Sequence, residues 1–404
     1  MGAVSPLAGR IPAVEPYDAA RRRWDVIVIG AGPAGCSAAW HLANAGRQVL
    51  IVERSRPPRE KVCGDGLLAD ALGAIAEMGL AGEVRRVAHA VDRVRIYSPS
   101  RVTFDLPGDF LTLRRRDLDT LLLRAALERG AVLAVGTVEG VAQDDTGVSV
   151  GTAGAAVLRG GYAVVATGAD TSLVRGGETG VPSAVALRTY VRAPGADIGA
   201  LTVSFDRSIL PGYAWIFPLG GDDYNVGCGV FYREHGAKPP VNLRTLLQIF
   251  VREFPPARAL GLHAAPAVAG ARLRCGLAGA GHVHHGRVVA IGETIGTTFA
   301  FTGEGIGKAM QTGALAAEHL DAALAGDAGA LGQLRARIER DLAPKYLGYD
   351  IAQRWLSHAW LADLLARRVR RSERLRAQVT GILNETADPR TVFSLRGLVP
   401  ALVR

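Results

Sequence analysis

Three glycines near the start of the chain, Gly30, Gly32 and Gly35, follow the spacing G-x-G-x-x-G. They come directly after an apolar run at 26–29 and before a run of helix-forming residues at 36–45. In such a strand–turn–helix unit, the first glycine permits the turn, the second lets a pyrophosphate approach the backbone, and the third lets helix and strand pack closely. The helix N-terminus then directs free N–H groups at the phosphates. The spacing therefore predicts a dinucleotide site.

An acidic residue supports this interpretation. A second apolar run, at 49–52, ends at Glu53, where a carboxylate is placed to accept hydrogen bonds from an adenosine ribose. Strand, helix, second strand and acid thus fall in register, whereas a glycine triplet alone would also fit a turn that binds nothing. A second G-x-G-x-x-G is missing. We therefore expect NAD(P)H to visit transiently as the electron donor, or a redox partner protein to deliver the electrons.

The composition limits the class of protein. With 404 residues and 49% hydrophobic content, the chain is long enough for a large core divided into two or three lobes. Its four cysteines lack C-x-x-C spacing, which predicts a reducing compartment and no bound metal. The net charge of +9 favours anionic partners such as a membrane surface, although an excess of arginine also follows from genome composition. Nucleic acid is disfavoured, because the basic tail lacks interleaved aromatic residues.

Hydropathy predicts where the protein resides. The chain shows no secretory signal and no apolar run near the length that spans a bilayer. We therefore expect a cytoplasmic protein, or one that is peripheral at the inner face of the membrane. The helical tail is most basic at 367–376. Two interpretations of this tail stay open: it lies on an anionic membrane, or it packs against the protein with its arginines in water.

The order of predicted elements indicates an α/β fold. Strands and helices alternate up to residue 135, an antiparallel meander follows at 141–158, and an apolar strand at 287–291 returns to the first sheet. Between them, residues 181–276 alternate in a pattern typical of an antiparallel sheet. The predicted parts are a flexible arm at 1–23, a dinucleotide-binding domain at 24–180 plus 277–328, a substrate-binding β-sheet domain at 181–276, and a helical region at 329–404.

Two further stretches are specific enough to compare with a family. Residues 62–67 read VCGDGL, and residues 213–218 read YAWIFP, followed after eight residues by GCG at 227–229. The first resembles the Cys-Gly-Asp-Gly loop of the geranylgeranyl reductases, and the second is similar to their Y-x-W-x-F-P…G-x-G substrate motif. Together with the glycine fingerprint, the chain resembles these flavoproteins, relatives of the p-hydroxybenzoate hydroxylase type, over nearly all of 24–325.

The resemblance implies a fold and a cofactor. The fold is a Rossmann-like FAD-binding domain of the glutathione reductase and p-hydroxybenzoate hydroxylase type, with an inserted antiparallel β-sheet substrate domain and a helical C-terminus. The residues that it implies for FAD binding are Gly30, Gly32, Ala34, Gly35, Glu53, Arg54, Cys63, Gly64, Gly66, Arg115, Val138, Glu293, Gly305 and Ile306. Those that it implies for the substrate are Tyr213, Trp215, Phe217, Pro218, Gly227 and Gly229.

The implied reaction is reduction of C=C bonds in a prenyl chain of a lipid, quinone or related natural product, with hydride passing from the donor through reduced FAD. An isolated alkene is a poor hydride acceptor, so protonation must accompany the transfer, and the transition state has carbocation character. Aromatic faces stabilise such a charge by roughly 0.5–2 kcal/mol each. Tyr213, Trp215 and Phe217 alternate along one strand and share a face, which predicts a channel wall, with core packing as the alternative. Tyr213 and Trp215 are therefore candidate catalytic residues.

Several alternatives stay open. Cys63 is a candidate catalytic residue by resemblance, but a small residue packed beside FAD fits equally well. Phe299 and Ala300 stand where relatives have Asn-Pro, at the expected reactive edge of the flavin, which indicates an atypical substrate. Another function that fits is an FAD-dependent monooxygenase or halogenase acting on an aromatic or natural-product substrate. A third is a non-catalytic flavin-binding or electron-relay protein.

Overall fold

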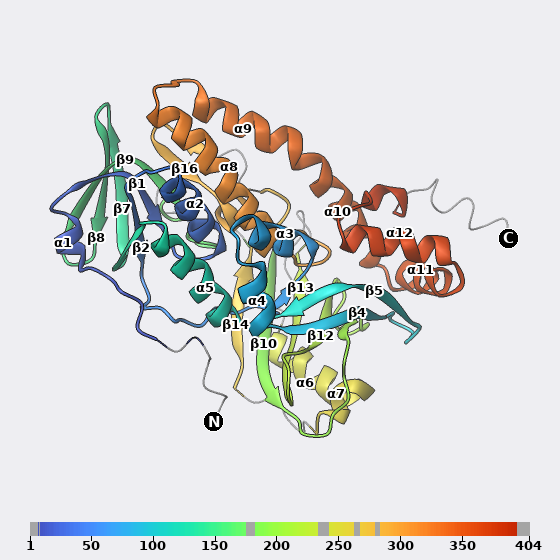
Figure 1. The fold of residues 1–404 in the computed structure, drawn as a ribbon. Helices are drawn as coiled ribbons and strands as arrows, with labels where there is room; N and C mark the ends of the chain where they lie inside the picture. The colour runs from blue at the N-terminus through green and yellow to red at the C-terminus, as the bar shows by residue number, and fades with distance from the viewer. Residues whose placement is uncertain are drawn as a thin grey trace.

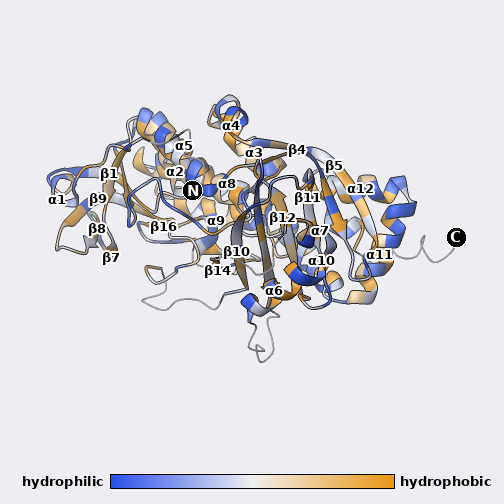
Figure 2. Cartoon of the chain, turned by 90° about the horizontal axis from the view of Figure 1, so that it is seen from below, coloured by the Kyte–Doolittle hydropathy of each residue, from blue (hydrophilic) through white to orange (hydrophobic). Residues whose placement is uncertain are grey.

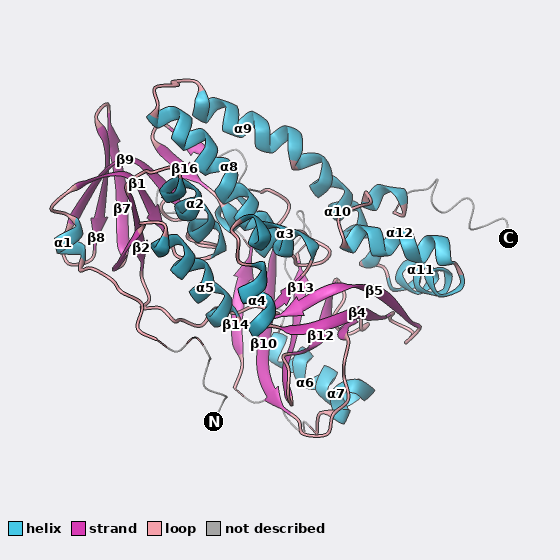
Figure 3. Ribbon diagram, in the orientation of Figure 1, coloured by secondary structure: helices cyan, strands magenta, loops and turns pink. Residues whose placement is uncertain are grey.

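Two β-sheets organise the part of the chain that the computed structural model describes, which is residues 7, 9–174, 182–232, 242–261, 267–278 and 283–393. Figure 1 shows the first sheet at the left and the second at the lower centre, with α-helices above and between them. The same alternation of helices and strands is visible in Figure 3. The described structure is thus an α/β fold with a second sheet, as the sequence predicted.

The first sheet has a parallel centre in the order β16-β9-β1-β2-β6. Its strands are β1 (Arg23–Ile29), β2 (Val49–Glu53), β6 (Val132–Val135), β9 (Val157–Val165) and β16 (Val288–Ala290), with β7 (Val138–Asp144), β8 (Gly147–Thr152) and β15 (His284–His285) added antiparallel. Every residue of β2 is buried, because parallel strands covered on both faces need apolar side chains throughout. The β7–β8–β9 hairpins are the predicted meander.

Three helices pack together beside this sheet: α2 (Pro33–Asn44), α5 (Arg115–Glu128) and α8 (Ile306–Leu324). The short α1 (Pro16–Ala19) contacts β6 and β9, and α9 (Ala330–Asp341) packs on α8. Gly35 allows α2 to start directly above β1, because a Cβ there would lie 1.9 Å from the carbonyl oxygen of Gly30. The third glycine of the fingerprint therefore serves close packing, as its spacing predicted.

The second sheet has the order β14-β10-β13-β12-β11-β4-β5-β3. Its strands are β3 (Gly66–Leu67), β4 (His89–Tyr97), β5 (Thr103–Thr112), β10 (Ala184–Arg192), β11 (Leu201–Ser204), β12 (Gly212–Pro218), β13 (Asp223–Phe231) and β14 (Ala269–Leu273). All neighbours are antiparallel except β11 and β4. Helices α6 (Leu243–Glu253) and α7 (Pro255–Ala259) pack against it through Phe250 and Phe254, which are fully buried.

The sheets differ from the predicted domain boundaries in one place. Strands β3, β4 and β5 belong to the second sheet, although they fall within residues 24–180 of the predicted dinucleotide-binding domain. The reason is the parallel pairing of β4 with β11, a contact between segments about a hundred residues apart that leaves no local pattern. The predicted flexible arm also differs, because Ile11 is 2% exposed and the amide of Val14 donates to the carbonyl of Leu133 at 2.8 Å.

The remaining helices lie around the second sheet and at its far end. They are α3 (Ala69–Glu77), α4 (Ala81–Val87), α10 (Ala343–Leu356), α11 (Ala359–Arg371) and α12 (Glu373–Leu383), with short 3-10 turns η2 (Gly292–Ile295) and η3 (Pro389–Thr391). Helices α11 and α12 pack against β5, and Figure 2 shows many hydrophilic residues on their outer turns. None of the helices in the described ranges is long and apolar enough to cross a membrane.

Candidate functional site

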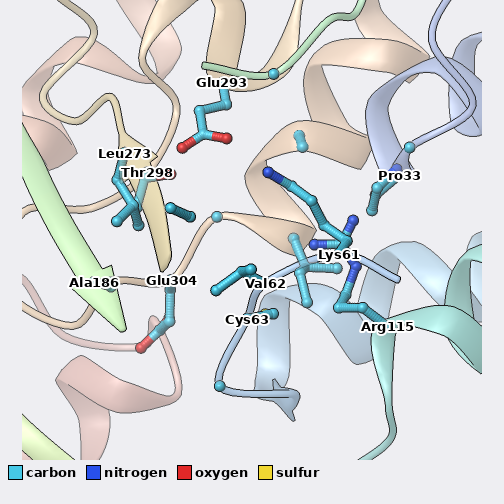
Figure 4. A pocket seen from close by; sticks show the side chains of 18 of the residues that line it. Pro33, Lys61, Val62, Cys63, Arg115, Ala186, Leu273, Glu293, Thr298 and Glu304 are labelled. Atoms are coloured by element: carbon cyan, nitrogen blue, oxygen red, sulfur yellow. The ribbon is translucent and has the colours of Figure 1, made fainter. Parts of the chain in front are cut away.

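A cavity of about 450 Å³ lies where the two sheets meet. One end is bordered by the glycine turn after β1, and the other by the face of β12, with the loop at 60–66 between them. Figure 4 shows this cavity with Pro33 and Arg115 on one side and Glu304 and Ala186 on the other. The site therefore joins the first turn of the chain to the second sheet.

The end near the glycine turn carries paired charges. The carboxylate of Glu53 accepts hydrogen bonds from the amides of Ala31 at 2.9 Å and Ser55 at 3.1 Å. The Arg59 guanidinium lies 3.2 Å from Glu53 Oε2 and 3.1 Å from Asp119 Oδ2. Arg115, at the start of α5, binds Asp119 with two hydrogen bonds of 2.8 and 3.0 Å. These pairs fix both arginine side chains beside the turn, where they can face an anion.

The space beside Gly32 tests whether a phosphate group fits there. A Cβ built on Gly32 would meet nothing nearer than Arg59 Nη2, at 3.9 Å. The backbone of the turn is therefore open to the cavity, with a guanidinium at its border and the N-terminus of α2 behind it. An open glycine, a helix N-terminus and an arginine are the set that a pyrophosphate requires.

Glu293 lies deeper in the cavity, in the turn η2 that follows β16. Its Oε1 accepts a hydrogen bond from the amide of Arg274 at 3.3 Å. Burial raises the pKa of this carboxyl group, and the nearby charge of Lys61 acts in the opposite direction. Figure 4 shows Lys61 extending across the cavity toward Glu293. Glu293 can therefore accept hydrogen bonds from hydroxyl groups of a ligand.

The turn before α8 forms a wall of the cavity with Gly303, Glu304, Gly305 and Ile306. Gly305 is the N-cap of α8, so the first amides of the helix are free of intrahelical partners. Tyr213 holds the turn by donating a hydrogen bond from its hydroxyl to the carbonyl of Thr302 at 2.6 Å. These amides can stabilise negative charge on a ring placed against them.

The three alternating aromatic residues of β12, Tyr213, Trp215 and Phe217, all line the cavity. Their rings form a continuous row, with centroids 6.0 Å apart for the first pair and 6.4 Å for the second. Phe205 and Phe301 continue this apolar wall, and their stacked rings are 6.2 Å apart. The prediction that these three side chains share one face is confirmed.

Asp65 lines the cavity, and the sequence analysis did not single it out as a site residue. It is fully buried, its Oδ2 accepts hydrogen bonds from Tyr190 and Asn225, both at 2.8 Å, and its Oδ1 accepts from the amide of Arg115 at 3.1 Å. Asn225 in turn accepts from Trp215 Nε1 at 2.9 Å. Burial raises the pKa of Asp65 to about 6 against these hydrogen bonds. The residue ties the loop at 62–66 to the aromatic wall; its place between two glycines was the available clue.

Cys63 lines the cavity in the same loop. Burial raises the pKa of its thiol, and the neighbouring Arg115 acts in the opposite direction. The thiol is therefore protonated at neutral pH, so the environment does not favour a nucleophilic thiolate. Its predicted catalytic role stays a prediction.

Most of the predicted site residues lie together. The ones that line the cavity are Gly30, Gly32, Ala34, Glu53, Arg54, Cys63, Gly64, Gly66, Arg115, Val138, Tyr213, Trp215, Phe217, Gly229, Glu293, Gly305 and Ile306. Gly35, Pro218 and Gly227 lie outside its lining. Gly35 serves the packing of α2, and Gly227 leaves room for the Trp215 ring, since a Cβ there would lie 2.3 Å from Trp215 Cζ2. Pro218 ends β12, where it pairs with Tyr224.

Phe299 and Ala300, which stand where relatives have Asn-Pro, lie outside the cavity. Phe299 is fully buried and stacks on Tyr349 of α10 with ring centroids 3.7 Å apart. Neither Phe299 nor Ala300 lines the cavity, whereas Thr298 and Phe301 do. The pair therefore does not border the cavity in which the flavin is expected, because the Phe299 ring packs on Tyr346 and Tyr349 of α10 instead.

Comparison with known proteins agrees with this geometry. Residues 23–182 match the family model described as FAD binding domain. The chain is 34% identical to the menaquinone reductase of Mycolicibacterium smegmatis over 73% of this chain and 76% of that one. It is also 34% identical to digeranylgeranylglycerophospholipid reductase 2 of Methanopyrus kandleri, over 51% and 54% of the two chains.

Solved structures show the same fold. A geranylgeranyl bacteriochlorophyll reductase-like protein from Thermoplasma acidophilum superposes with a TM-score of 0.75 and 20% identity, over 95% of this chain and 96% of that one. A flavin-dependent brominase reaches a TM-score of 0.72 at 19% identity, over 95% and 98%. The fold therefore serves more than one flavin chemistry, and the sequence relatives distinguish among them.

An FAD-binding domain, a cavity that fits a dinucleotide and an extended match to the reductases lead to the same result. The chain belongs to the geranylgeranyl reductase family of FAD-dependent flavoprotein oxidoreductases.

Proposed function

We propose that this protein reduces C=C bonds in the prenyl chain of a lipid or quinone, with FAD as its redox cofactor. The observation that carries the proposal is that one cavity joins a charged end suited to a dinucleotide with an apolar end walled by aromatic rings. A monooxygenase acting on a polar aromatic compound would need polar groups at the second end. The relatives named as reductases of menaquinone and of a digeranylgeranyl lipid support the same substrate class.

The chain offers a contact for each part of FAD. Glu53 is placed for the adenosine ribose, the turn at Gly32 and Arg115 for the pyrophosphate, Glu293 for the ribityl hydroxyl groups, and Gly305 for the ring edge. Arg54, Gly64 and Val138 complete the proposed wall. When bound and reduced, FAD supplies a hydride at the apolar end of the cavity.

The aromatic wall has two proposed roles in the reaction. The rings of Tyr213 and Trp215 exclude water from the alkene, and their faces stabilise positive charge that develops on a tertiary carbon. Phe217 and Gly229 border the remaining space. Trp215 is held in orientation by its hydrogen bond to Asn225, so its face is fixed before the substrate arrives.

The electron donor is proposed to be NAD(P)H that binds transiently, or a redox partner protein, since the fingerprint occurs once in the sequence. A membrane surface is the proposed source of the substrate. On α11, Trp360 is 66% exposed, and Arg367 and Arg371 follow it at spacings of seven and eleven, which place them on the same helix face. An exposed tryptophan beside arginines suits an anionic lipid interface.

Anaerobic reoxidation of the flavin tests the proposed function. The protein-bound flavin is reduced without oxygen and then mixed with a prenylated lipid that lacks a quinone ring, with its fully saturated analogue, or with oxygen. The proposal expects reoxidation by the prenylated compound and not by the saturated one. Rapid reaction with oxygen through a C4a-adduct spectrum, with no response to the alkene, would instead support a monooxygenase or halogenase.

A further inference from the structure

A buried acidic cluster borders the cavity, and the proposed function leaves it without a role. Its members are Asp70 in α3, Glu304 in the turn before α8, and Glu385 after α12. One carboxylate oxygen of each lies within 4.8 Å of the others. Asp70 and Glu304 also line the cavity. The cluster thus adjoins the cavity at the turn before α8, whose residues Gly305 and Ile306 are the predicted contacts to the flavin ring.

Two lysines face this cluster. The amino group of Lys308 is fully buried and lies 2.5 Å from Glu385 Oε1 and 3.6 Å from Asp70 Oδ2. The amino group of Lys345 lies 3.3 Å from Glu385 Oε2, and its side chain is 49% exposed. Glu385 therefore connects a surface lysine to the buried acids, and Glu304 connects the buried acids to the cavity.

Glu304 is the member whose surroundings favour the protonated form. Neither carboxyl oxygen touches solvent or has a hydrogen-bond partner among the described residues. An ionised carboxylate in such a place is strongly disfavoured, and burial, followed by the charges of Asp70 and Glu385, raises its pKa well above the usual value. The charge of Lys308 acts in the opposite direction. The phenols of Tyr213 and Tyr349 also face Glu304, and burial raises their pKa values.

Reduction of an isolated alkene requires such a proton. The two electrons of the π bond form a new C–H bond with a proton, and a hydride forms the second C–H bond on the resulting carbocation. The hydride is the contribution of the reduced cofactor, and an acidic side chain that lines the cavity is placed to supply the proton. The thiol of Cys63 and the phenol of Tyr213 are weak acids in this cavity, since burial raises the pKa of each.

We propose that Glu304 donates the proton that reduction of the alkene consumes, and that Asp70 and Glu385 return a proton to it from solvent at Lys345. This inference rests on the proposed function. In Figure 4 the Glu304 carboxyl group points away from Lys61 and Arg115. A change of its side-chain rotamer therefore moves the proton from the cluster to the cavity. In net balance, one acid proton and one hydride convert C=C to HC–CH, and the Glu304 carboxylate regains its proton through the cluster.

A bound divalent cation is the other occupant that three carboxylates suggest. Lys308 argues against it, because its amino group already lies between Asp70 and Glu385 and supplies the positive charge. The infrared experiment described next distinguishes a bound cation from a protonated Glu304.

Infrared difference spectroscopy of the cofactor-free protein tests directly whether Glu304 is protonated. The pH is set well above 6, because burial raises the pKa of Asp65 and of Asp70 to about 6 and both must be ionised. We expect the wild type to show the carbonyl band of a protonated carboxylic acid and Glu304→Gln to lose this band. The control variant Glu339→Gln, which changes an exposed side chain of α9, should keep it. An absent band, a band that survives Glu304→Gln, or a band abolished by Mg²⁺ or Ca²⁺ overturns the inference.

Single-turnover reduction of a prenylated lipid that lacks a quinone ring tests the donor role. We expect Glu304→Gln to slow the alkene step by about 10²- to 10⁴-fold, the usual contribution of a general acid, with FAD content unchanged. Glu385→Gln should leave the first turnover near wild type and slow later ones, and Glu339→Gln should change neither. Equal rates for Glu304→Gln and wild type overturn the inference. If the wild type itself reduces no prenyl alkene, the proposed function fails and the donor role fails with it, while the infrared band still reports whether Glu304 is protonated.

Discussion

The role of Trp215 can be separated from its part in holding the fold. Replacement by alanine removes an aromatic face worth roughly 0.5–2 kcal/mol to a carbocation, so kcat for alkene reduction should fall by roughly two- to thirty-fold. Trp215→Phe keeps a ring but loses the hydrogen bond to Asn225 and should retain most of the turnover. Steady-state kinetics and FAD content are the measurements. An alanine variant that loses FAD in proportion to its activity would show that the ring is structural.

Asp65 makes stability depend on pH. Its pKa is about 6 in the folded protein against 3.8 in the reference state. Between these values the folded state binds more protons than the unfolded state, so the free energy of unfolding falls as pH rises through this window, by about 3 kcal/mol at most.

Urea unfolding of the cofactor-free protein between about pH 4 and pH 7 measures this effect. The wild type should lose stability with rising pH relative to Asp65→Asn, which carries no titrating proton there. Parallel curves for the two proteins would rule out the raised pKa.

Two glycines of β13 show how a strand makes room for a functional ring. Gly227→Ala would place a Cβ 2.3 Å from Trp215 Cζ2 and 2.5 Å from the carbonyl oxygen of Leu187. We expect a loss of about 1–3 kcal/mol in unfolding free energy and a shifted tryptophan emission. Gly229→Ala is the matched control for stability, because its nearest neighbour is at 3.4 Å. Equal urea midpoints for both variants would contradict the packing argument.

At the scale of helices and strands, the sequence predicts those features that depend on residues close together in the chain. The β1–α2–β2 unit, the meander and the shared face of Tyr213 and Trp215 follow from spacing alone, because each depends on neighbouring residues. The pairing of β4 with β11 and the contact of Asp65 with Asn225 each join segments that are distant in the chain, so no local sequence pattern predicts them. Glu304 lies in the turn before α8, but its two acidic neighbours, Asp70 and Glu385, come from two distant segments of the chain.

The whole molecule presents one face on which the proposed membrane contact can be tested. Trp360→Ser should lower co-sedimentation with anionic lipid vesicles several-fold, and added salt should weaken binding of the wild type, because screening reduces the attraction of Arg367 and Arg371. Tyr17→Ser, which alters an exposed aromatic residue of α1, is the control. If co-sedimentation with the vesicles is unchanged by Trp360→Ser and by added salt, the proposed lipid contact through α11 is contradicted.

The central claim is that the cavity carries out hydrogenation of a prenyl chain. Mass spectrometry of a prenylated lipid that lacks a quinone ring, after anaerobic turnover with the FAD-loaded protein and an excess of chemical reductant, tests it most directly. The account predicts a product heavier by two hydrogen atoms for each bond reduced, and by two deuterium atoms for each bond in heavy water, because the proton and the N5 hydrogen of a chemically reduced flavin both come from solvent. An unchanged lipid, or a product that gains an oxygen or halogen atom when oxygen and halide are admitted, would contradict it.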